Sequence, residues 1–226
     1  MIFRQLFEPI SSTYTYLLGC EDTGQAVLVD PVLPAWQRDL EELRRLGLTL
    51  AYTLDTHIHA DHITAARKLR EEVGSRIAHP AIDGLPCADL GVEEGVALQV
   101  GSVRIEPIFT PGHTDGHHAY CVADRVLTGD ALLIEGCGRT DFQNGDARAQ
   151  WASRRCRLAL PGDTEVWPGH DYRGWTRSSI AEEAAHNPRL QVADGAAYAQ
   201  LMANLKLPNP KLMDVAVPAN RACGQG

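Results

Sequence analysis

Three histidines and one aspartate fall within six consecutive positions of this chain, directly after a short apolar run. The four residues are His57, His59, Asp61 and His62. The apolar run at residues 48–54 predicts a buried strand and residues 63–73 predict a helix, so the cluster lies in the turn between them. Because α/β proteins usually place binding and catalytic groups in loops at the carboxyl ends of strands, this turn is the first candidate site.

The donor atoms of this cluster restrict the ligand that it can bind. Imidazole nitrogens together with carboxylate oxygens suit zinc or ferrous iron, whereas magnesium and calcium favour oxygen ligands alone. A solvated loop that caps the following helix would account for Thr56 or Asp61 alone, and a structural role would account for a single histidine. Three histidines so close together favour a metal site over either alternative.

Length and composition favour one folded domain. The chain has 226 residues, of which 44% are apolar and 22% are charged, and these values are ordinary for a globular protein. No run rich in glycine and serine or in one charge divides the chain. We therefore predict a single domain over residues 1–226, which ends in an extended, irregular tail at about 206–226.

Net charge and cysteine spacing bear on partners and compartment. A formal net charge of −8 argues against a nucleic-acid or anionic-membrane surface, since either would need a basic face. No stretch approaches the roughly 18 apolar residues of a membrane span. The first residues enter a strand-like pattern with no targeting signal, so a cytoplasmic address is expected. The six cysteines form no Cys-x-x-Cys pair and are predicted to be reduced thiols.

Three more predicted strands end in a histidine or an aspartate. One strand runs into Pro-Gly-His113, a second stops at Gly-Asp130, and a third runs into Pro-Gly-His170. Each of these residues stands in the same position relative to its strand as His57 does after residues 48–54. All three are therefore further candidates for the site.

The rest of the chain alternates short strands with amphipathic helices. Strands are predicted at residues 3–6, 13–18, 26–29, 76–78, 96–100, 103–109, 119–122, 126–128 and 165–167. Helices are predicted at residues 36–46, 146–160, 180–186 and 194–205. Residues 83–95 have no clear period and are expected to form a loop. This order of elements indicates an α/β protein.

The four strand-end motifs, in this order and spacing, resemble those of the metallo-β-lactamase superfamily. They are Thr-His-Ile-His-Ala-Asp-His from Thr56, Pro-Gly-His-Thr from Pro111, Thr-Gly-Asp from Thr128 and Pro-Gly-His-Asp from Pro168. The resemblance implies an αβ/βα sandwich, in which two mixed central sheets are flanked by helices and metal binds at one edge. Since the superfamily contains hydrolases, nucleases and oxygenases, these motifs leave the reaction open.

A narrower resemblance concerns the reaction. Residues 129–143, Gly-Asp-Ala-Leu-Leu-Ile-Glu-Gly-Cys-Gly-Arg-Thr-Asp-Phe-Gln, are similar to the persulfide dioxygenase family, also called sulfur dioxygenases, and residues 187–224 resemble the same family. The resemblance implies one Fe(II) per chain and the oxidation of glutathione persulfide by O₂ to sulfite and glutathione. It assigns the iron to His57, His113 and Asp130, two histidines and one carboxylate that leave coordination positions open.

The same resemblance assigns roles around the iron. It implies that nearby polar groups orient the ligands and ordered water. These groups are His59, Asp61, His62 and His170. Glutathione is anionic, so arginine and polar side chains near the motifs are expected to bind it. The predicted substrate-binding residues are Arg139, Tyr172, Arg173, Asn220 and Cys223. His117 and His118 stand where relatives usually carry small or apolar residues, while His79 and His186 are interpreted as ordinary surface or structural histidines.

Two alternative functions stay open from the sequence. A glyoxalase II-like hydroxyacylglutathione hydrolase with two metals would share the fold, the motifs and glutathione, but the Gly-Cys-Gly-Arg-Thr-Asp-Phe segment at residues 136–142 and the short tail count against it. A non-catalytic thiol-binding or sulfur-sensing protein on the same scaffold would have lost a metal ligand, and none is missing. The expected partners are glutathione persulfide and O₂, with no nucleic acid and no membrane, and the chain is expected to be a monomer or homodimer.

Overall fold

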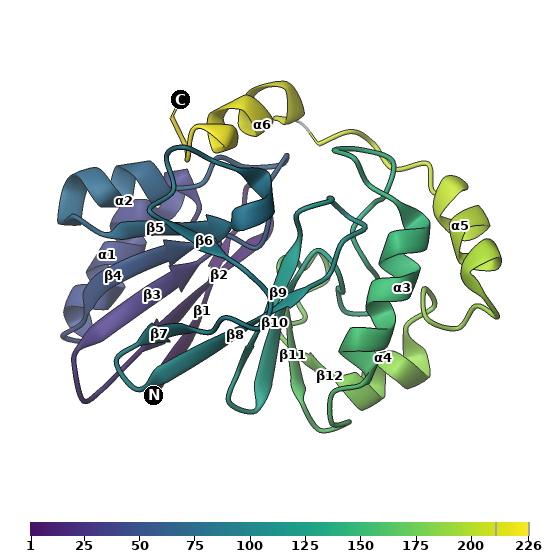
Figure 1. Cartoon of the computed structure of the whole chain (residues 1–226), viewed down its shortest axis with the longest axis horizontal. Helices are drawn as coiled ribbons and strands as arrows, with labels where there is room; N and C mark the ends of the chain where they lie inside the picture. The colour runs from purple at the N-terminus through teal and green to yellow at the C-terminus, as the bar shows by residue number, and fades with distance from the viewer. Residues whose placement is uncertain (211, 226) are drawn as a thin grey trace.

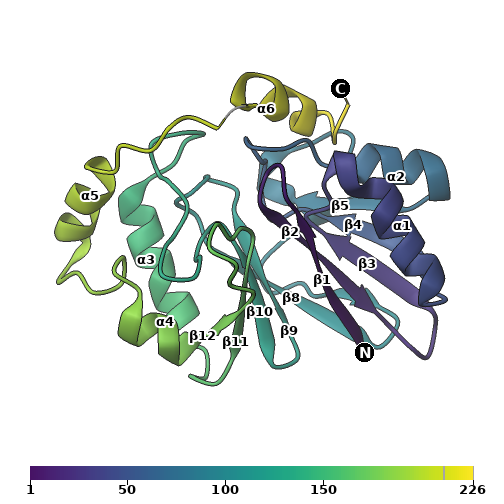
Figure 2. The same ribbon diagram turned by 180° about the vertical axis from the view of Figure 1, so that it is seen from behind.

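Two six-stranded sheets lie face to face at the centre of the molecule, and helices cover their outer faces (Figures 1 and 2). This computed structural model describes residues 1–210 and 212–225, with side chains for all of these except 155–158. Both sheets contain parallel and antiparallel pairs. The predicted α/β sandwich of two mixed sheets flanked by helices is therefore confirmed.

The first sheet has the strand order β1-β2-β3-β4-β5-β6. Its strands are β1 (Ile2–Glu8), β2 (Thr13–Gly19), β3 (Gln25–Val29), β4 (Thr49–Leu54), β5 (Arg76–Pro80) and β6 (Leu90–Val92). The pairs from β1 to β3 are antiparallel and those from β3 to β6 are parallel. Every residue of β2 is buried, because the sheet is covered on both faces.

The second sheet has the strand order β12-β11-β10-β9-β8-β7. Its strands are β7 (Leu98–Val100), β8 (Val103–Phe109), β9 (His118–Val122), β10 (Arg125–Gly129), β11 (Glu165–Pro168) and β12 (Ser178–Ser179). Only β10 and β11 pair in parallel among these described strands. Two antiparallel hairpins, β7-β8 and β9-β10, therefore precede the one parallel crossover of this sheet.

The helices lie outside the two sheets and at one edge (Figure 1). They are α1 (Trp36–Arg45), α2 (Ala66–Val73), α3 (Ala147–Leu158), α4 (Ile180–His186), α5 (Gly195–Ala203) and α6 (Met213–Arg221), with short 3₁₀ helices η1 (Leu33–Ala35) and η2 (Ala81–Asp83). Ser179 and Asp194 cap α4 and α5 by accepting hydrogen bonds from first-turn amides. No helix of the described residues is long and apolar enough to cross a membrane.

The apolar core lies between the two sheets, with a second apolar layer under α1 and α2. Alternation along β2 divides its side chains between the two, since Tyr16 and Leu18 join the central cluster and Leu17 joins the outer one. The central cluster contains residues of both sheets, among them Leu54 and Ile105. One shared core favours the predicted single domain over residues 1–226, which stays a prediction.

Two segments differ from the sequence prediction. The tail was expected to be irregular at 206–226, and this is wrong for Met213–Arg221, which forms α6 with Pro218 inside the helix. Residues 83–95 were expected to be a loop, yet they contain β6, a short parallel edge strand beside β5. In both segments contacts with the rest of the fold outweigh residue types that disfavour regular structure.

A disulfide joins Cys87 to Cys223. The prediction that all six cysteines are reduced thiols is therefore wrong for this pair, whose members lie 136 positions apart in the sequence. Cys20, Cys121 and Cys137 carry thiols, as predicted, and Cys156 lies outside the described side chains. The bond packs in a small apolar cluster and ties the end of α6 to the segment before β6.

We expect Cys87→Ser to lower the free energy of unfolding by about 2–5 kcal/mol, because the disulfide closes a long loop and so restricts the unfolded chain. Urea unfolding of metal-free protein measures this change. The matched control is Cys121→Ser, which alters a half-buried thiol. Thiol titration of unfolded, unreduced protein checks the bond itself, and six reactive thiols per chain would contradict it.

Candidate metal centre

Three residues from different strand ends converge at one edge of the sandwich. His57 follows β4, His113 follows β8 and Asp130 follows β10. One potential ligand atom from each lies within 4.8 Å of the others. The His113 Nε2 atom is 3.4 Å from Asp130 Oδ2, and the rings of His57 and His113 are 4.8 Å apart between centroids. The structure thus brings together the three residues predicted to bind the metal.

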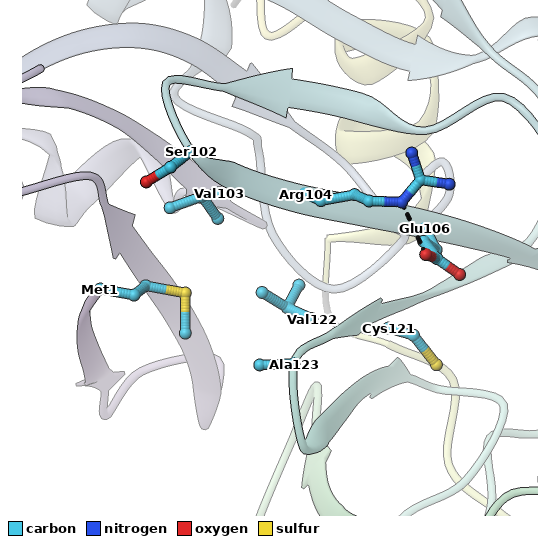
Figure 3. Close-up of a pocket in the computed structure, with 8 residues that line it drawn as sticks. All are labelled: Met1, Ser102, Val103, Arg104, Glu106, Cys121, Val122 and Ala123. Carbon is cyan, nitrogen blue, oxygen red and sulfur yellow. Dashed lines mark hydrogen bonds and ion pairs between the residues drawn. The ribbon is translucent and has the colours of Figure 1, made fainter. Parts of the chain in front are cut away.

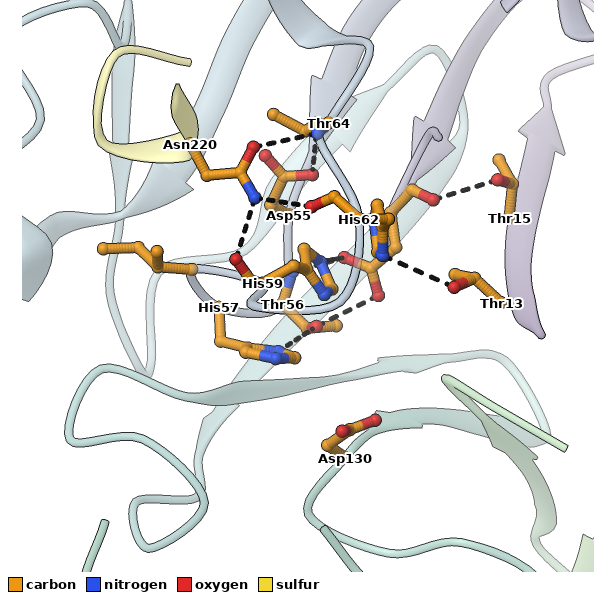
Figure 4. Close-up of polar contacts among 12 residues, drawn as sticks. Thr13, Thr15, Asp55, Thr56, His57, His59, His62, Thr64, Asp130 and Asn220 are labelled. Atoms are coloured by element: carbon orange, nitrogen blue, oxygen red, sulfur yellow. Dashed lines mark hydrogen bonds and ion pairs between the residues drawn. The ribbon is translucent and has the colours of Figure 1, made fainter. Parts of the chain in front are cut away.

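Hydrogen bonds fix which ring nitrogens face the cluster. Thr56 Oγ1 donates to Asp30 at 3.0 Å, so it accepts the proton of His57 Nδ1 at 2.9 Å (Figure 4). His113 Nδ1 donates to the carbonyl oxygen of Arg139 at 2.7 Å. Both histidines are therefore left with Nε2 to bind a metal, the tautomer that ligating histidines usually adopt.

The electrostatic environment also fits a cation. Burial, and then the charge of His59, hold the pKa of His57 well below its ordinary value, so the ring is neutral and its lone pair is available. Within the described part of the chain, Asp130 Oδ1 is buried and accepts no hydrogen bond. Because a buried carboxylate oxygen without a hydrogen bond is costly, this atom fits a metal ligand.

A second group of polar residues lies beside the first. His62 Nδ1 is 3.0 Å from Asp61, and His170 Nε2 is 3.6 Å from Asp61 and 3.4 Å from Asp130. Ligand atoms of His59, Asp61 and His62 lie within 4.8 Å of one another. All four residues predicted to surround the first three are therefore in place. By donor type, this group is able to hold a second cation.

His59 is held by a buried aspartate. Its Nε2 atom lies 3.0 Å from Asp30 Oδ1. Burial is the largest single effect and lowers the pKa of His59, but the charge and hydrogen bond of Asp30, with the charges of Asp55 and Asp61, together outweigh it and raise the pKa to about 9. Asp30 also accepts from the Thr56 amide at 2.7 Å. One aspartate thus anchors the turn and one of its histidines.

The turn that carries these histidines is also held by Asn220 of α6 (Figure 4). Its side-chain nitrogen donates to the carbonyl oxygens of His59 at 2.9 Å and His62 at 2.8 Å, and its oxygen accepts from the Thr64 amide at 2.9 Å. Asn220 is buried and each of its amide atoms binds backbone. The predicted role in substrate binding is therefore corrected, because this side chain shapes the metal loop.

We expect Asn220→Ala to destabilise the protein by roughly 2–5 kcal/mol and to reduce bound metal, since each buried backbone group left unpaired costs about 1–3 kcal/mol. Thermal unfolding and metal analysis measure the two effects. Asn204→Ala, at an exposed asparagine that ends α5, is the matched control. Full metal content together with a raised KM for substrate would instead restore the substrate-binding interpretation.

The other predicted substrate-binding residues have different surroundings. The Arg139 guanidinium pairs with Asp141 and donates to the Pro208 carbonyl oxygen at 2.9 Å. The Tyr172 ring lies 6.1 Å from the His170 ring, nearly parallel to it, and is 72% exposed. Exposed Arg173 pairs with Glu135 at 3.0 Å. Cys223 is buried in the disulfide, so the prediction that it binds substrate is also corrected.

Two further histidines are placed by the structure. His79, interpreted from the sequence as a surface or structural histidine, is buried and has the structural role, because its Nε2 atom bonds Asp83 at 2.8 Å. His117 lies among the metal-site residues, with its ring 4.9 Å from the His57 ring. From the sequence, His117 was noted only as a departure from the family pattern and was not among the predicted site residues. The available signal was its position four residues after His113 in the same strand-connecting loop.

A cavity of about 430 Å³ lies elsewhere in the molecule (Figure 3). Its lining residues are Met1, Ser102, Val103, Arg104, Glu106, Cys121, Val122 and Ala123. None of these belongs to the metal cluster, and Arg104 pairs with Glu106 at 2.7 Å. This cavity is therefore separate from the metal site.

Comparison with known proteins agrees with the geometry of this metal centre. The family model of the metallo-beta-lactamase superfamily matches residues 9–170. The chain therefore belongs to this superfamily, and its edge cluster is a metal-binding site of that class.

Within the superfamily the relatives are specific. Persulfide dioxygenase ETHE1 of Homo sapiens is 44% identical over 99% of this chain and 89% of the relative. The crystal structure of ETHE1 from Myxococcus xanthus has a TM-score of 0.96 and 52% identity, covering 99% and 100% of the two chains. A hydroxyacylglutathione hydrolase of Cereibacter sphaeroides is 38% identical but matches only 72% of this chain and 64% of its own length. The chain belongs to the persulfide dioxygenase family, and the predicted class of oxidoreductase is confirmed.

Proposed function

We propose that this chain oxidises glutathione persulfide with O₂ to sulfite and glutathione at one ferrous iron held by His57, His113 and Asp130. One molecule of O₂ and one of water supply the three oxygen atoms of sulfite. The observation that carries the proposal is the convergence of two histidine Nε2 atoms and a buried carboxylate whose Oδ1 atom accepts no hydrogen bond in the described structure. It is supported by relatives named persulfide dioxygenase that match nearly the whole chain.

The donor set supports iron over the other common metals. Two histidines with one carboxylate, and coordination positions left open, are typical of non-haem ferrous oxygenases. When bound, ferrous iron supplies the open positions and the redox change that reaction with O₂ needs. The protein supplies fixed tautomers: the Arg139 carbonyl oxygen holds the Nδ1 proton of His113, and Thr56 holds that of His57.

Exposure indicates the side from which substrate reaches the cluster. His57 is 1% exposed, whereas the side chains of His113 and Asp130 are 11% and 14% exposed. On the other side of Asp130, buried His170 lies 3.4 Å from Oδ1 of this carboxylate and 3.6 Å from Asp61, so it orients Asp130. The persulfide sulfur and O₂ therefore approach over the edge formed by His113 and Asp130.

Tyr172 and Arg173 are the proposed contacts for glutathione. Both follow shortly after His170 in the chain and both are exposed, and the Tyr172 ring lies 6.1 Å from the His170 ring. Arg173 is paired with Glu135 at the surface, and surface ion pairs are weak, so a substrate carboxylate is able to replace Glu135 as its partner. Arg139 contributes through its backbone, because its guanidinium is bound by Asp141.

The test combines metal analysis with product analysis. Anaerobically purified protein should hold about one iron per chain, consume O₂ only when glutathione persulfide is present, and form sulfite in proportion. Zinc-only protein that consumes no O₂ after loading with ferrous iron would overturn the proposal.

We also propose a cytoplasmic address and a monomer or homodimer without nucleic-acid or membrane partners. The net charge of −8 supports the absence of these partners. The human relative is named as mitochondrial, so the location of this protein in the cell requires its own test. Cell fractionation settles the address, and light scattering after gel filtration settles the oligomeric state.

A further inference from the structure

We propose that His117 is a positioning residue for this reaction: it fixes the peptide that carries Asp130 and thereby sets the carboxylate in the metal site. The inference rests on the proposed function only in that Asp130 is a metal ligand. His117 is completely buried, and its Nε2 atom accepts the Asp130 amide proton at 3.1 Å. Its ring stacks on the His57 ring at 4.9 Å and 25°. It thus contacts one ligand by stacking and another by a hydrogen bond.

The hydrogen bonds define the tautomer of His117. A backbone N–H group can only donate, so the Nε2 atom that receives it from Asp130 carries no proton. The proton of the neutral ring is then on Nδ1, which donates to Thr110 Oγ1 at 2.8 Å. Both ring nitrogens are engaged by protein groups. His117 therefore lies among the ligands without being one of them.

His117 also lies directly against the turn that precedes Asp130. Gly129 has a φ of 48°, and a Cβ atom at this position would lie 2.7 Å from His117 Nε2 and 2.9 Å from Thr56 Oγ1. The side chains of His117 and Thr56 therefore pack directly against the backbone of Gly129, which leaves no room for a side chain at this position. Since Thr56 also holds His57, the same contact joins the two strand ends that supply ligands.

The Asp130 peptide is held at both ends. His117 binds its amide, and its carbonyl oxygen accepts from the Gly138 amide at 2.7 Å. The carboxylate lies between two histidines, with 3.4 Å from Oδ2 to His113 and 3.4 Å from Oδ1 to His170. A small rotation of the backbone at Asp130 would shift its carboxylate away from His57 and His113 and toward His170. Loss of the His117 acceptor releases one of the two restraints against this rotation.

The test compares two substitutions of similar size, His117→Gln and His117→Leu. A glutamine keeps an acceptor near the position of Nε2, whereas a leucine has none. Cobalt(II) is the probe, because its visible spectrum reports ligand geometry without O₂ or persulfide. We expect His117→Leu to weaken cobalt binding roughly 10–100-fold in chelator competition, the usual cost of losing a ligand-orienting group, and to shift the spectrum. By the same reasoning, His117→Gln should stay within about threefold of the native protein.

Two further variants keep the test decisive. His118→Leu alters the adjacent buried histidine, whose Nδ1 donates to the Gly116 carbonyl oxygen, and it should leave cobalt affinity and spectrum unchanged. Thr110→Val removes the partner of the Nδ1 proton and should weaken cobalt binding less than His117→Leu does, so it serves if His117→Leu does not fold. Native affinity and spectrum in His117→Leu, or in Thr110→Val where the former does not fold, would overturn the proposal.

The same measurements separate this inference from the proposed function. Weaker cobalt binding in His117→Leu, together with no O₂ uptake by native iron-loaded protein, would leave the positioning role standing and reject the reaction. Native cobalt binding in His117→Leu, together with persulfide-dependent O₂ uptake by the native protein, would reject the positioning role and support the reaction.

Discussion

Asp130→Ala is expected to abolish O₂ consumption with glutathione persulfide and to release the metal. Asp130 provides the one carboxylate of the proposed triad, and its Oδ1 atom has no hydrogen-bond partner in the described structure. Without it, two neutral histidines remain to bind a divalent cation. The loss of activity should therefore exceed the roughly 10–100-fold that removal of a ligand-orienting group costs. Metal analysis and O₂ electrode measurements on the same sample test both effects.

The matched control is Asp124→Ala, at the opposite end of β10. The Asp124 side chain is 70% exposed and pairs only with Arg125 among the ion pairs of the described residues, so its removal should leave metal content and activity unchanged. Asp130→Asn adds a second comparison, because it keeps the shape of the side chain and removes the charge. Full iron content in both Asp130 variants would show that this residue is not a ligand.

The site could be predicted from the sequence because its ligands are tied to strand ends. His57, His113 and Asp130 each follow a predicted strand, and the sheet brings such ends to one edge. The alternation of strands and helices likewise indicated the α/β class. The residue types of the three strand-end groups indicated a metal site, and the order of the strands indicated that these groups lie close together.

The parts that sequence analysis missed depend on contacts between distant segments. Asn220 was assigned to substrate, but its amide binds the loop at 59–64, more than 150 positions earlier in the chain. Cys87 and Cys223 lie 136 positions apart, and no local pattern pairs them. Pro218 suggested an irregular tail, while burial of one face of α6 keeps that segment helical.

His117 shows a different limit. Its residue type was noted, but its role depends on which atom faces the Asp130 amide, and this follows from the turn at Gly129. A sequence motif gives donor and acceptor types without giving their directions. For the same reason, Arg139 was predicted to act by its charge, whereas its carbonyl oxygen is the atom that contacts a proposed ligand.

The neighbouring group of His59, Asp61, His62 and His170 makes the hydrolase alternative worth a direct test. Thioester hydrolysis needs a metal-activated water, usually shared between two cations that also stabilise the developing oxyanion. The second group has donor atoms for such a cation, and His62 Nε2 has no hydrogen-bond partner in the described structure. Oxidation of a persulfide needs instead a metal that changes its redox state.

We therefore expect apo protein reloaded with ferrous iron to consume O₂ and form sulfite from glutathione persulfide, and apo protein reloaded with zinc to do neither. Zinc accepts the same histidine and carboxylate donors but undergoes no redox change, so it should occupy the site without restoring activity. Both forms should cleave S-lactoylglutathione negligibly, although this thioester offers the same glutathione moiety. The measurements are O₂ uptake, sulfite and thioester cleavage, each referred to the metal bound per chain. Thioester turnover by the zinc form that equals or exceeds sulfite formation by the iron form would establish the hydrolase and reject the dioxygenase.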